Sequence, residues 1–149
     1  DIRCTVAFGD RPRVRLRLAD RLADRGYAFF STIHPSTQIS EAAALGEGII
    51  INAQSYIGPN VRIGDHVLID SCINISHDVT VEDGCTITPN ATLAGGVVVE
   101  QDAYIGPSAT VIEDTTIGSG AIVGAGTVVT EDVPPETTVV GVPASPVEE

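Results

Sequence analysis

This 149-residue chain has no lysine, no methionine and no tryptophan, and it has only three tyrosines and three phenylalanines. Its eight basic residues are therefore all arginines, and seven of them lie within residues 1–25. Residues 26–149 carry Arg62 alone against sixteen carboxylates, so this part of the chain is strongly acidic. Such a surface repels nucleic acids and anionic membranes, and we expect neither as a partner.

The sequence also has few features of a secreted or membrane protein. No apolar run reaches the length of a membrane span, and no signal-peptide pattern is present. Three cysteines, Cys4, Cys72 and Cys85, are an odd number without metal-ligand spacing, which favours a reduced, cytoplasmic setting. Because the first residue is not methionine, we expect the chain to be part of a longer translated product.

Aliphatic residues recur at every sixth position from residue 33 to residue 129 without an insertion. The seventeen positions are Ile33, Ile39, Leu45, Ile51, Ile57, Ile63, Ile69, Ile75, Val81, Ile87, Leu93, Val99, Ile105, Val111, Ile117, Val123 and Val129. This period is that of the hexapeptide repeat of a parallel β-helix. Fortuitous spacing in an ordinary sheet protein does not explain seventeen successive matches.

The period also predicts how the side chains are arranged. Three hexads form one triangular coil of eighteen residues, so each aliphatic side chain points inward and stacks on the residue eighteen positions later. Ile33, Ile51 and Ile69 begin one such ladder. The narrow interior leaves room at a second inward position, four residues later, only for a small or β-branched side chain, and Cys85 falls on such a position. Glycines such as Gly58 suit tight corners, where a Cβ would be strained.

The segment before the repeat, residues 1–32, has a different character. We expect a strand over residues 2–8 and a helix over residues 11–25, with an apolar stripe on one side and arginines on the other. This βαβ unit is too small to hold its own core. We interpret it as the remnant of a larger α/β domain that covers the N-terminal end of the β-helix, with a purpose-built cap as the alternative.

The repeat region spans residues 33–134 and ends where prolines enter the sequence, since proline cannot donate to a strand ladder. Residues 135–149 are expected to cap the C-terminal end. Within them, residues 138–143 read as a last strand-like segment, and residues 144–149 as a loose tail.

A prism filled with aliphatic side chains has no internal pocket, which makes the histidines His34, His66 and His77 informative. His77 occupies an outward corner, is followed at once by Asp78, and lies one coil before Gly95. A carboxylate beside a histidine orients the ring and makes it a better general base. A glycine stacked against it leaves a backbone N–H open to a thioester carbonyl or its oxyanion. A solvated corner histidine without function is the alternative.

Several stretches of the sequence carry a family resemblance. They are residues 74–81 (NISHDVTV), 88–96 (TPNATLAGG), 103–111 (AYIGPSATV), 117–134 (IGSGAIVGAGTVVTEDVP) and 141–144 (GVPA). In these stretches the chain resembles the hexapeptide-repeat sugar O- and N-acyltransferases related to sialic acid O-acetyltransferase and to the bacillosamine-pathway UDP-amino-sugar N-acetyltransferase. Residues 27–35 resemble the join between that family's N-terminal sugar-nucleotide domain and its β-helix, so residues 1–32 would be the end of such a domain.

The resemblance implies a left-handed β-helix, a homotrimer, and acetyl-CoA bound along the groove between neighbouring prisms. It implies transfer of an acetyl group to an amino or hydroxyl group of a sugar, which would be nucleotide-linked, with no metal. His77 would be the base and Asp78 the carboxylate that supports it, while Gly95 would donate its amide to the acetyl group. Positions that line the coenzyme groove would be Thr86, Pro107 and Ala125.

The sequence departs from the family pattern at two of these places. Thr86 stands where relatives often have histidine, and Ser145 stands where they usually have lysine or arginine after the GVPA motif. Two other functions therefore remain open at this stage. One is a non-catalytic trimeric β-helix that serves as a scaffold or an inactive partner subunit. The other is a zinc enzyme of the γ-carbonic anhydrase type, although the histidines here are thirty-two and eleven residues apart.

Overall fold

The computed structural model describes residues 2–7 and 13–147. Two-residue strands repeat every six residues through its centre. They are β3 (Thr32–Ile33), β4 (Gln38–Ile39), β5 (Ala44–Leu45), β6 (Ile50–Ile51), β7 (Tyr56–Ile57), β8 (Arg62–Ile63), β9 (Leu68–Ile69), β10 (Asn74–Ile75), β11 (Thr80–Val81), β12 (Thr86–Ile87), β13 (Thr92–Leu93), β14 (Val98–Val99), β15 (Tyr104–Ile105), β16 (Thr110–Val111), β17 (Thr116–Ile117), β18 (Ile122–Val123) and β19 (Val128–Val129). The flanking elements are β1 (Arg3–Cys4), α1 (Val14–Ala23), β2 (Ala28–Phe29), β20 (Thr138–Val140) and β21 (Ser145–Pro146).

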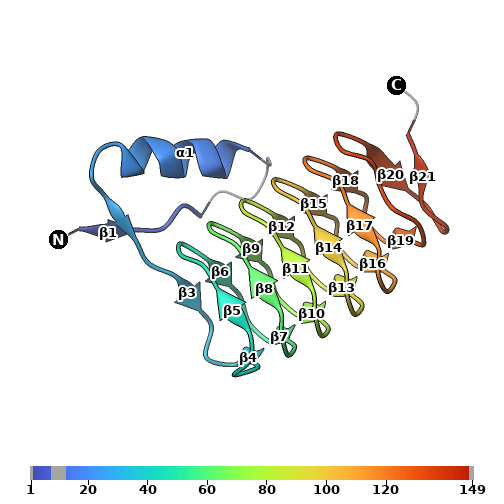
Figure 1. Ribbon diagram of the computed structural model, residues 1–149, viewed down its shortest axis with the longest axis horizontal. Coiled ribbons are helices and arrows are strands. Elements are labelled where there is room, and N and C mark those ends of the chain that lie inside the picture. Colours follow the sequence, from blue (N-terminus) through green and yellow to red (C-terminus); the bar gives the residue numbers. More distant parts are fainter. Residues whose placement is uncertain (1, 8–12, 148–149) are drawn as a thin grey trace.

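The strands form the three faces of a prism (Figure 1). The first face contains β3, β6, β9, β12, β15, β18, β20 and β21, the second contains β4, β7, β10, β13, β16 and β19, and the third contains β5, β8, β11, β14 and β17. Paired strands from β3 to β19 are parallel and eighteen residues apart, as in Ile69 with Ile87. The expected parallel β-helix is therefore confirmed. We call the turn from the first to the second face the first corner, from the second to the third the second corner, and from the third to the first the third corner.

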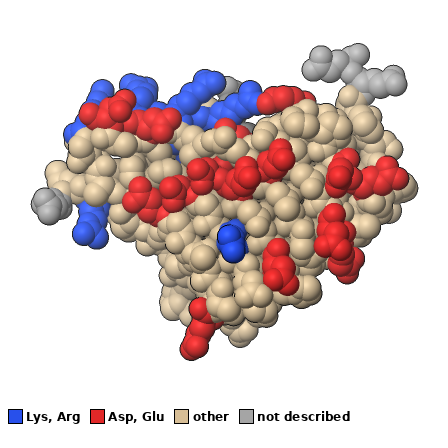
Figure 2. Space-filling model, in the orientation of Figure 1, with Lys and Arg blue, Asp and Glu red and all other residues tan. Residues whose placement is uncertain are grey.

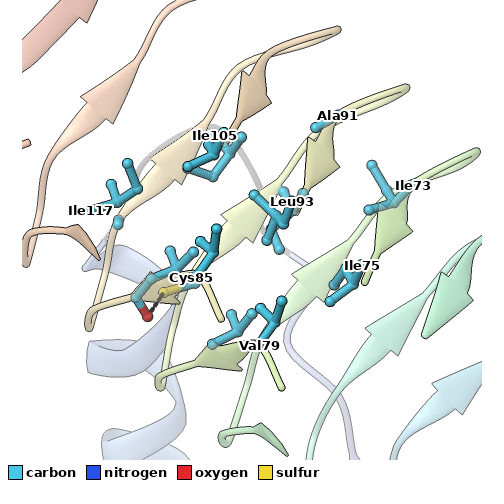
Figure 3. Packing of buried hydrophobic residues seen from close by; sticks show 14 of the residues in the cluster. Ile73, Ile75, Val79, Cys85, Ala91, Leu93, Ile105 and Ile117 are labelled. Carbon is cyan, nitrogen blue, oxygen red and sulfur yellow. Dashed lines mark hydrogen bonds between the residues drawn. The ribbon is translucent and has the colours of Figure 1, made fainter. Parts of the chain in front are cut away.

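The core consists of the two inward positions of each hexad. From Ile51 onward the aliphatic ladder is closed to solvent, whereas Ile33 in the first coil is 41% exposed; small residues such as Ala91 fill the second inward position. Figure 3 shows inward side chains from successive coils, among them Ala91, Leu93 and Ile105. Burial of apolar area at each level is the main stabilising term, and removal of one such side chain would cost roughly 2–5 kcal/mol.

The chain turns at the corners through residues in the left-handed backbone region, and only some of these residues are glycines. A left-handed residue with φ between 55° and 72° recurs every six residues, and it is often Asn or Asp, as at Asn60 (φ 60°) and Asp78 (φ 60°). These two residue types tolerate this region better than other non-glycine residues. Gly58 is not in this conformation. It is required by close approach, because a Cβ there would lie 2.7 Å from the backbone carbonyl of Ser76 in the next coil.

Many carboxylates of the acidic prism stabilise its corners. Asp65 Oδ1 accepts a hydrogen bond from the N–H of Glu47 (2.8 Å), and Asp83 Oδ1 accepts one from the N–H of Asp65 (2.7 Å). Glu100 accepts one from the N–H of Ser119 (2.9 Å). Each bond joins one coil to the next and satisfies a backbone donor that the strand ladder leaves open. Part of the negative charge therefore has a structural role.

The position of the N-terminal segment differs from our expectation. Helix α1 lies along the first face and the third corner of the prism, not over its N-terminal end (Figure 1). Arg15, on the arginine side of the predicted helix, is buried and donates to the backbone oxygens of His66 (2.6 Å), Gly84 (2.7 Å) and Cys85 (2.8 Å). Hydrogen bonds from a charged guanidinium are stronger than those between neutral groups, so these carbonyls help to hold α1 at the third corner.

The ends of the flanking segments are shorter or more ordered than expected. Strand β1 covers two of the residues predicted as a strand over 2–8; residues 5–7 are described but are not in a strand, and residue 8 lies outside the described residues. At the C-terminal end, β20 pairs in parallel with β18, and β21 returns antiparallel to it. The predicted loose tail therefore contributes a paired strand, although residues 148–149 lie outside the described part. No helix among the described residues is long and apolar enough to cross a membrane.

Cys72 and Cys85 should react very differently with iodoacetamide at pH 8. Burial raises the pKa of the Cys85 thiol to about 12, so Cys85 stays protonated and inaccessible, whereas Cys72 is exposed. Mass spectrometry of the native protein should show Cys72 alkylated and Cys85 unmodified until denaturant is added. Modification of Cys85 at the rate of Cys72 in the native state would contradict the core position assigned to it.

Candidate active site

His77 lies in the second corner, between β10 and β11, and stacking between coils fixes its backbone. Its carbonyl accepts the N–H of Gly96 (3.1 Å), and the next residue, Asp78, donates its N–H to the carbonyl of Pro59 (3.0 Å). The imidazole projects from the prism and its side chain is 62% exposed. The corner therefore presents an acid–base group to solvent without disturbing the core.

The His77 ring and the Asp78 carboxylate form a hydrogen-bonded pair. His77 Nδ1 lies 2.8 Å from Asp78 Oδ2. This bond from His77, and a second bond from Asn60, hold the pKa of the Asp78 carboxyl below its usual range, so that the carboxylate is charged at neutral pH. A charged carboxylate can only accept, so Nδ1 carries the proton and Nε2 is left as an acceptor. The pair is thus arranged for Nε2 to take a proton from a ligand.

Asn60 is a site residue that our sequence reasoning missed. Its Nδ2 donates to Asp78 Oδ1 at 3.0 Å from the preceding coil. The carboxylate is therefore held on both oxygens, by Asn60 on one and by His77 on the other. The signal was present in the sequence, since Asn60 stands eighteen residues before Asp78, which is the stacking distance of the β-helix.

Gly95 lies directly against the His77 ring, as the eighteen-residue period predicts. A Cβ at Gly95 would be 2.5 Å from His77 Cε1 and 2.8 Å from Nε2, which is closer than real Cβ contacts allow. Gly95 is buried, and its N–H donates no hydrogen bond to any residue in 2–7 or 13–147. The site therefore has a proton acceptor and an unused amide donor on residues that lie against each other.

The structure does not bring all the predicted residues together within one prism. Pro107 and Ala125 are exposed in the first corner, on the opposite edge of the second face from His77. Thr86 lies on the first face and is 1% exposed, because α1 covers it and Arg15 Nη2 donates to its hydroxyl (2.9 Å). The coenzyme contact predicted for Thr86 is not available while α1 lies in this position.

The described residues contain no group of three His, Cys, Asp or Glu side chains placed to hold a metal ion. His66, one of the three histidines, is buried in the third corner, and its ring packs edge-on against Phe29 with centroids 4.5 Å apart. It does not approach His77 as a second ligand would, because the two lie in different corners.

Comparisons with known proteins assign the fold and the motif to a family. Residues 60–95 and 96–131 match the model described as bacterial transferase hexapeptide (six repeats). A mutant of perosamine N-acetyltransferase from Caulobacter crescentus, solved with CoA and GDP-perosamine, is 37% identical with a TM-score of 0.95, and the match covers 99% of this chain and 70% of that chain. The chain belongs to the hexapeptide-repeat acyltransferases.

Two further solved structures are also similar to this hexapeptide-repeat acyltransferase. The acetyltransferase domain of PglB from Neisseria gonorrhoeae FA1090, in complex with acetyl coenzyme A, is 31% identical with a TM-score of 0.92, over 96% of this chain and 69% of that chain. WeeI from Acinetobacter baumannii AYE is 29% identical with a TM-score of 0.62, over 97% and 70%. No curated protein sequence matches the chain. The family resemblance drawn from the hexads and the His77 motif is confirmed.

If the acyltransferase uses the His77–Asp78 pair, Asn60→Ala should lower its turnover several-fold by releasing one oxygen of Asp78. The control is Ser119→Ala, because the Ser119 hydroxyl donates to Glu100 Oε2 (3.2 Å) from one coil to the next at the third corner, away from both edges of the second face. Steady-state kinetics should show a loss for Asn60→Ala and none for Ser119→Ala. Equal rates for the two variants would mean that Asn60 does not position Asp78 for catalysis.

Proposed function

We propose that the chain transfers an acetyl group from acetyl-CoA to the amino group of a nucleotide-linked sugar. The observation that carries this proposal is the pairing of His77 Nδ1 with a charged Asp78, while the ring lies against Gly95, whose N–H forms no hydrogen bond with a described residue. Solved relatives with this fold include a perosamine N-acetyltransferase with CoA and GDP-perosamine and an acetyltransferase domain with acetyl coenzyme A.

In this mechanism the acceptor nitrogen attacks the thioester carbonyl carbon directly. His77 Nε2 takes one proton from the nitrogen as the new C–N bond forms, and Asp78 stabilises the imidazolium that results. The carbonyl oxygen becomes an oxyanion, which can accept the unused N–H of Gly95. When the C–S bond breaks, the CoA thiolate takes the proton back from His77. The products are the acetamido sugar and CoA, and no acyl-enzyme is formed.

The coenzyme would lie in a groove that two copies of the chain share. Pro107 and Ala125 line one edge of the second face and His77 lines the other, so one prism cannot present them to one ligand. If three prisms turn their second faces to a common axis, the first corner of each meets the second corner of its neighbour. This arrangement places the predicted coenzyme contacts beside His77 and completes the site.

We therefore expect a homotrimer in solution, because the groove does not exist in a single chain. Multi-angle light scattering of the purified protein should give the mass of three chains. Acetyl-CoA binding should disappear with the assembly, so dilution below the dissociation constant of the trimer should abolish both together. A stable monomer that binds acetyl-CoA with full affinity would exclude the shared groove.

The proposed reaction is tested by incubating the full-length protein with acetyl-CoA and GDP-perosamine and following release of the CoA thiol. Mass spectrometry should show one acetyl group on the sugar nitrogen, and omission of the acceptor should stop thiol release. Methyl perosaminide and a hydroxyl analogue of the sugar, tested in parallel, report the requirement for nucleotide and amine. No transfer to any amino sugar nucleotide, by a correctly folded trimer, would exclude the proposed function.

A further inference from the structure

An open hollow with a volume of about 940 Å³ lies on the third face of the prism, along β5, β8 and β11. Its edge at the second corner includes Asp78 and Asn60, so it adjoins the proposed catalytic pair. The opposite edge includes Glu82 and Asp83, next to the third corner. A hollow of this size is in the range that accommodates small-molecule ligands.

Arg62 projects from the middle of this face. Its strand pairs with β5 and β11 in register, so that Ala44 lies beside Arg62 on one side and Thr80 on the other. Both neighbours are small, and Arg62 is exposed. It is the only lysine or arginine in residues 26–149, on a face where carboxylates predominate (Figure 2).

The guanidinium of Arg62 forms no ion pair or hydrogen bond with any residue that the structure describes. The carboxylates around it are already used: Asp83 accepts the N–H of Asp65, and Glu82 accepts the N–H of Gln101 at 3.0 Å. Asp78 is held on both oxygens by Asn60 and by His77. Arg62 is thus left for a ligand, and a guanidinium fork binds phosphate groups in a bidentate manner.

We propose that Arg62 binds a phosphate group of the acceptor, so that the amino sugar lies across the hollow with its amino group toward Asp78 and His77. The hollow combines one unpaired cation with the carboxylates of Asp78, Glu82 and Asp83. It is therefore matched to a ligand with a negative group and a positive group, and an amino sugar attached to a phosphate has both. This assignment rests on the proposed function and names the part of the site that selects the acceptor.

Coenzyme A is the other source of phosphate, and the order of the coils argues against it. Arg62 comes before His77 in the prism, toward the N-terminal end, whereas Gly95, Pro107 and Ala125 come after it. A coenzyme that extends from Gly95 along the predicted contacts leads away from Arg62. The acceptor therefore approaches His77 from the N-terminal side and the coenzyme from the C-terminal side.

The test compares Arg62→Ala with the wild-type full-length protein, using GDP-perosamine and, as the same amino sugar without phosphate, methyl perosaminide. Loss of one charged phosphate contact should raise KM for GDP-perosamine by about 10- to 100-fold. KM for acetyl-CoA should stay within about twofold, and the two proteins should use methyl perosaminide equally well. Arg62→Lys should recover part of the loss, because it keeps the positive charge but not the planar guanidinium.

A second pair of variants leaves Arg62 in place. Ala44→Glu puts a carboxylate beside Arg62 across the strand pair and should reproduce the KM effect by pairing with it, whereas Ala44→Gln has nearly the same size without the charge and should not. An unchanged KM for GDP-perosamine in Arg62→Ala, or an increase in KM for acetyl-CoA instead, would overturn the proposal and leave the proposed function intact.

If the wild-type protein acetylates neither probe, no KM values can be compared, and calorimetric titration with GDP-perosamine decides the role of Arg62 separately from the proposed function. Binding by the wild-type protein that weakens in Arg62→Ala supports the proposal. Equal binding by the two proteins, or no binding by either, overturns it.

Discussion

His77→Ala is expected to lower the turnover number by about 10²- to 10⁴-fold, the usual contribution of a general base, and to leave coenzyme affinity and assembly nearly unchanged. The imidazole is 62% exposed and lies outside the aliphatic ladders, so its removal opens no cavity in the core. The loss should therefore appear in the rate of acetyl transfer at saturating substrates, and thermal unfolding should occur at the wild-type temperature.

The matched control for this variant is His34→Ala. His34 is also an exposed corner histidine, and its Nδ1 lies 2.9 Å from the hydroxyl of Ser36 instead of a carboxylate. His34→Ala should keep full turnover. Asp78→Asn should fall between the two, because the ring keeps a neighbour but loses the negative charge that stabilises its protonated form. If His77→Ala keeps full turnover, His77 is a solvated corner residue and the catalytic assignment is wrong.

Much of this site could be predicted from the period of the sequence, because residues that are eighteen positions apart lie next to each other in successive coils. The same period that stacks Ile87 on Ile69 places Gly95 against His77, and the structure shows both. The contact between Asn60 and Asp78 follows from the same period, because Asn60 stands eighteen residues before Asp78. Regular stacking leaves little freedom, so such contacts follow from numbering alone.

The contacts of α1 could not be predicted in this way. Its arginines look like a solvated face in the sequence, yet Arg15 is buried because it meets the carbonyl groups of three residues at the third corner. Those acceptors are created by the turns of separate coils, and no local pattern in the helix indicates them. The burial of Thr86 beneath α1 is a consequence of the same docking. The hexapeptide pattern does not indicate where α1 lies, so it could not show that Thr86 is covered.

Gly95→Ala is expected to reduce turnover by about 10²-fold or more while the fold remains intact. A Cβ at Gly95 would lie 2.5 Å from His77 Cε1, and the remaining near contacts are also atoms of this ring. The backbone at Gly95 is not in the left-handed region, so alanine causes no strain of its own there. The exposed imidazole can rotate away and relieve the contact, which moves Nε2 from its place beside Gly95, and a displacement of about 1 Å can cost 10²-fold in rate.

The double variant His77→Ala with Gly95→Ala separates this explanation from general damage to the corner. If the added methyl group acts only by moving the imidazole, it should cause no further loss once the imidazole is absent, and the double variant should have the turnover of His77→Ala. The unfolding temperature should match the wild type in all three proteins, since no core contact changes. Losses that multiply in the double variant would show that Gly95 contributes independently of His77, through its N–H or through contact with the substrate. An unaltered rate in Gly95→Ala alone would show that the ring position seen here is not the one used in acetyl transfer.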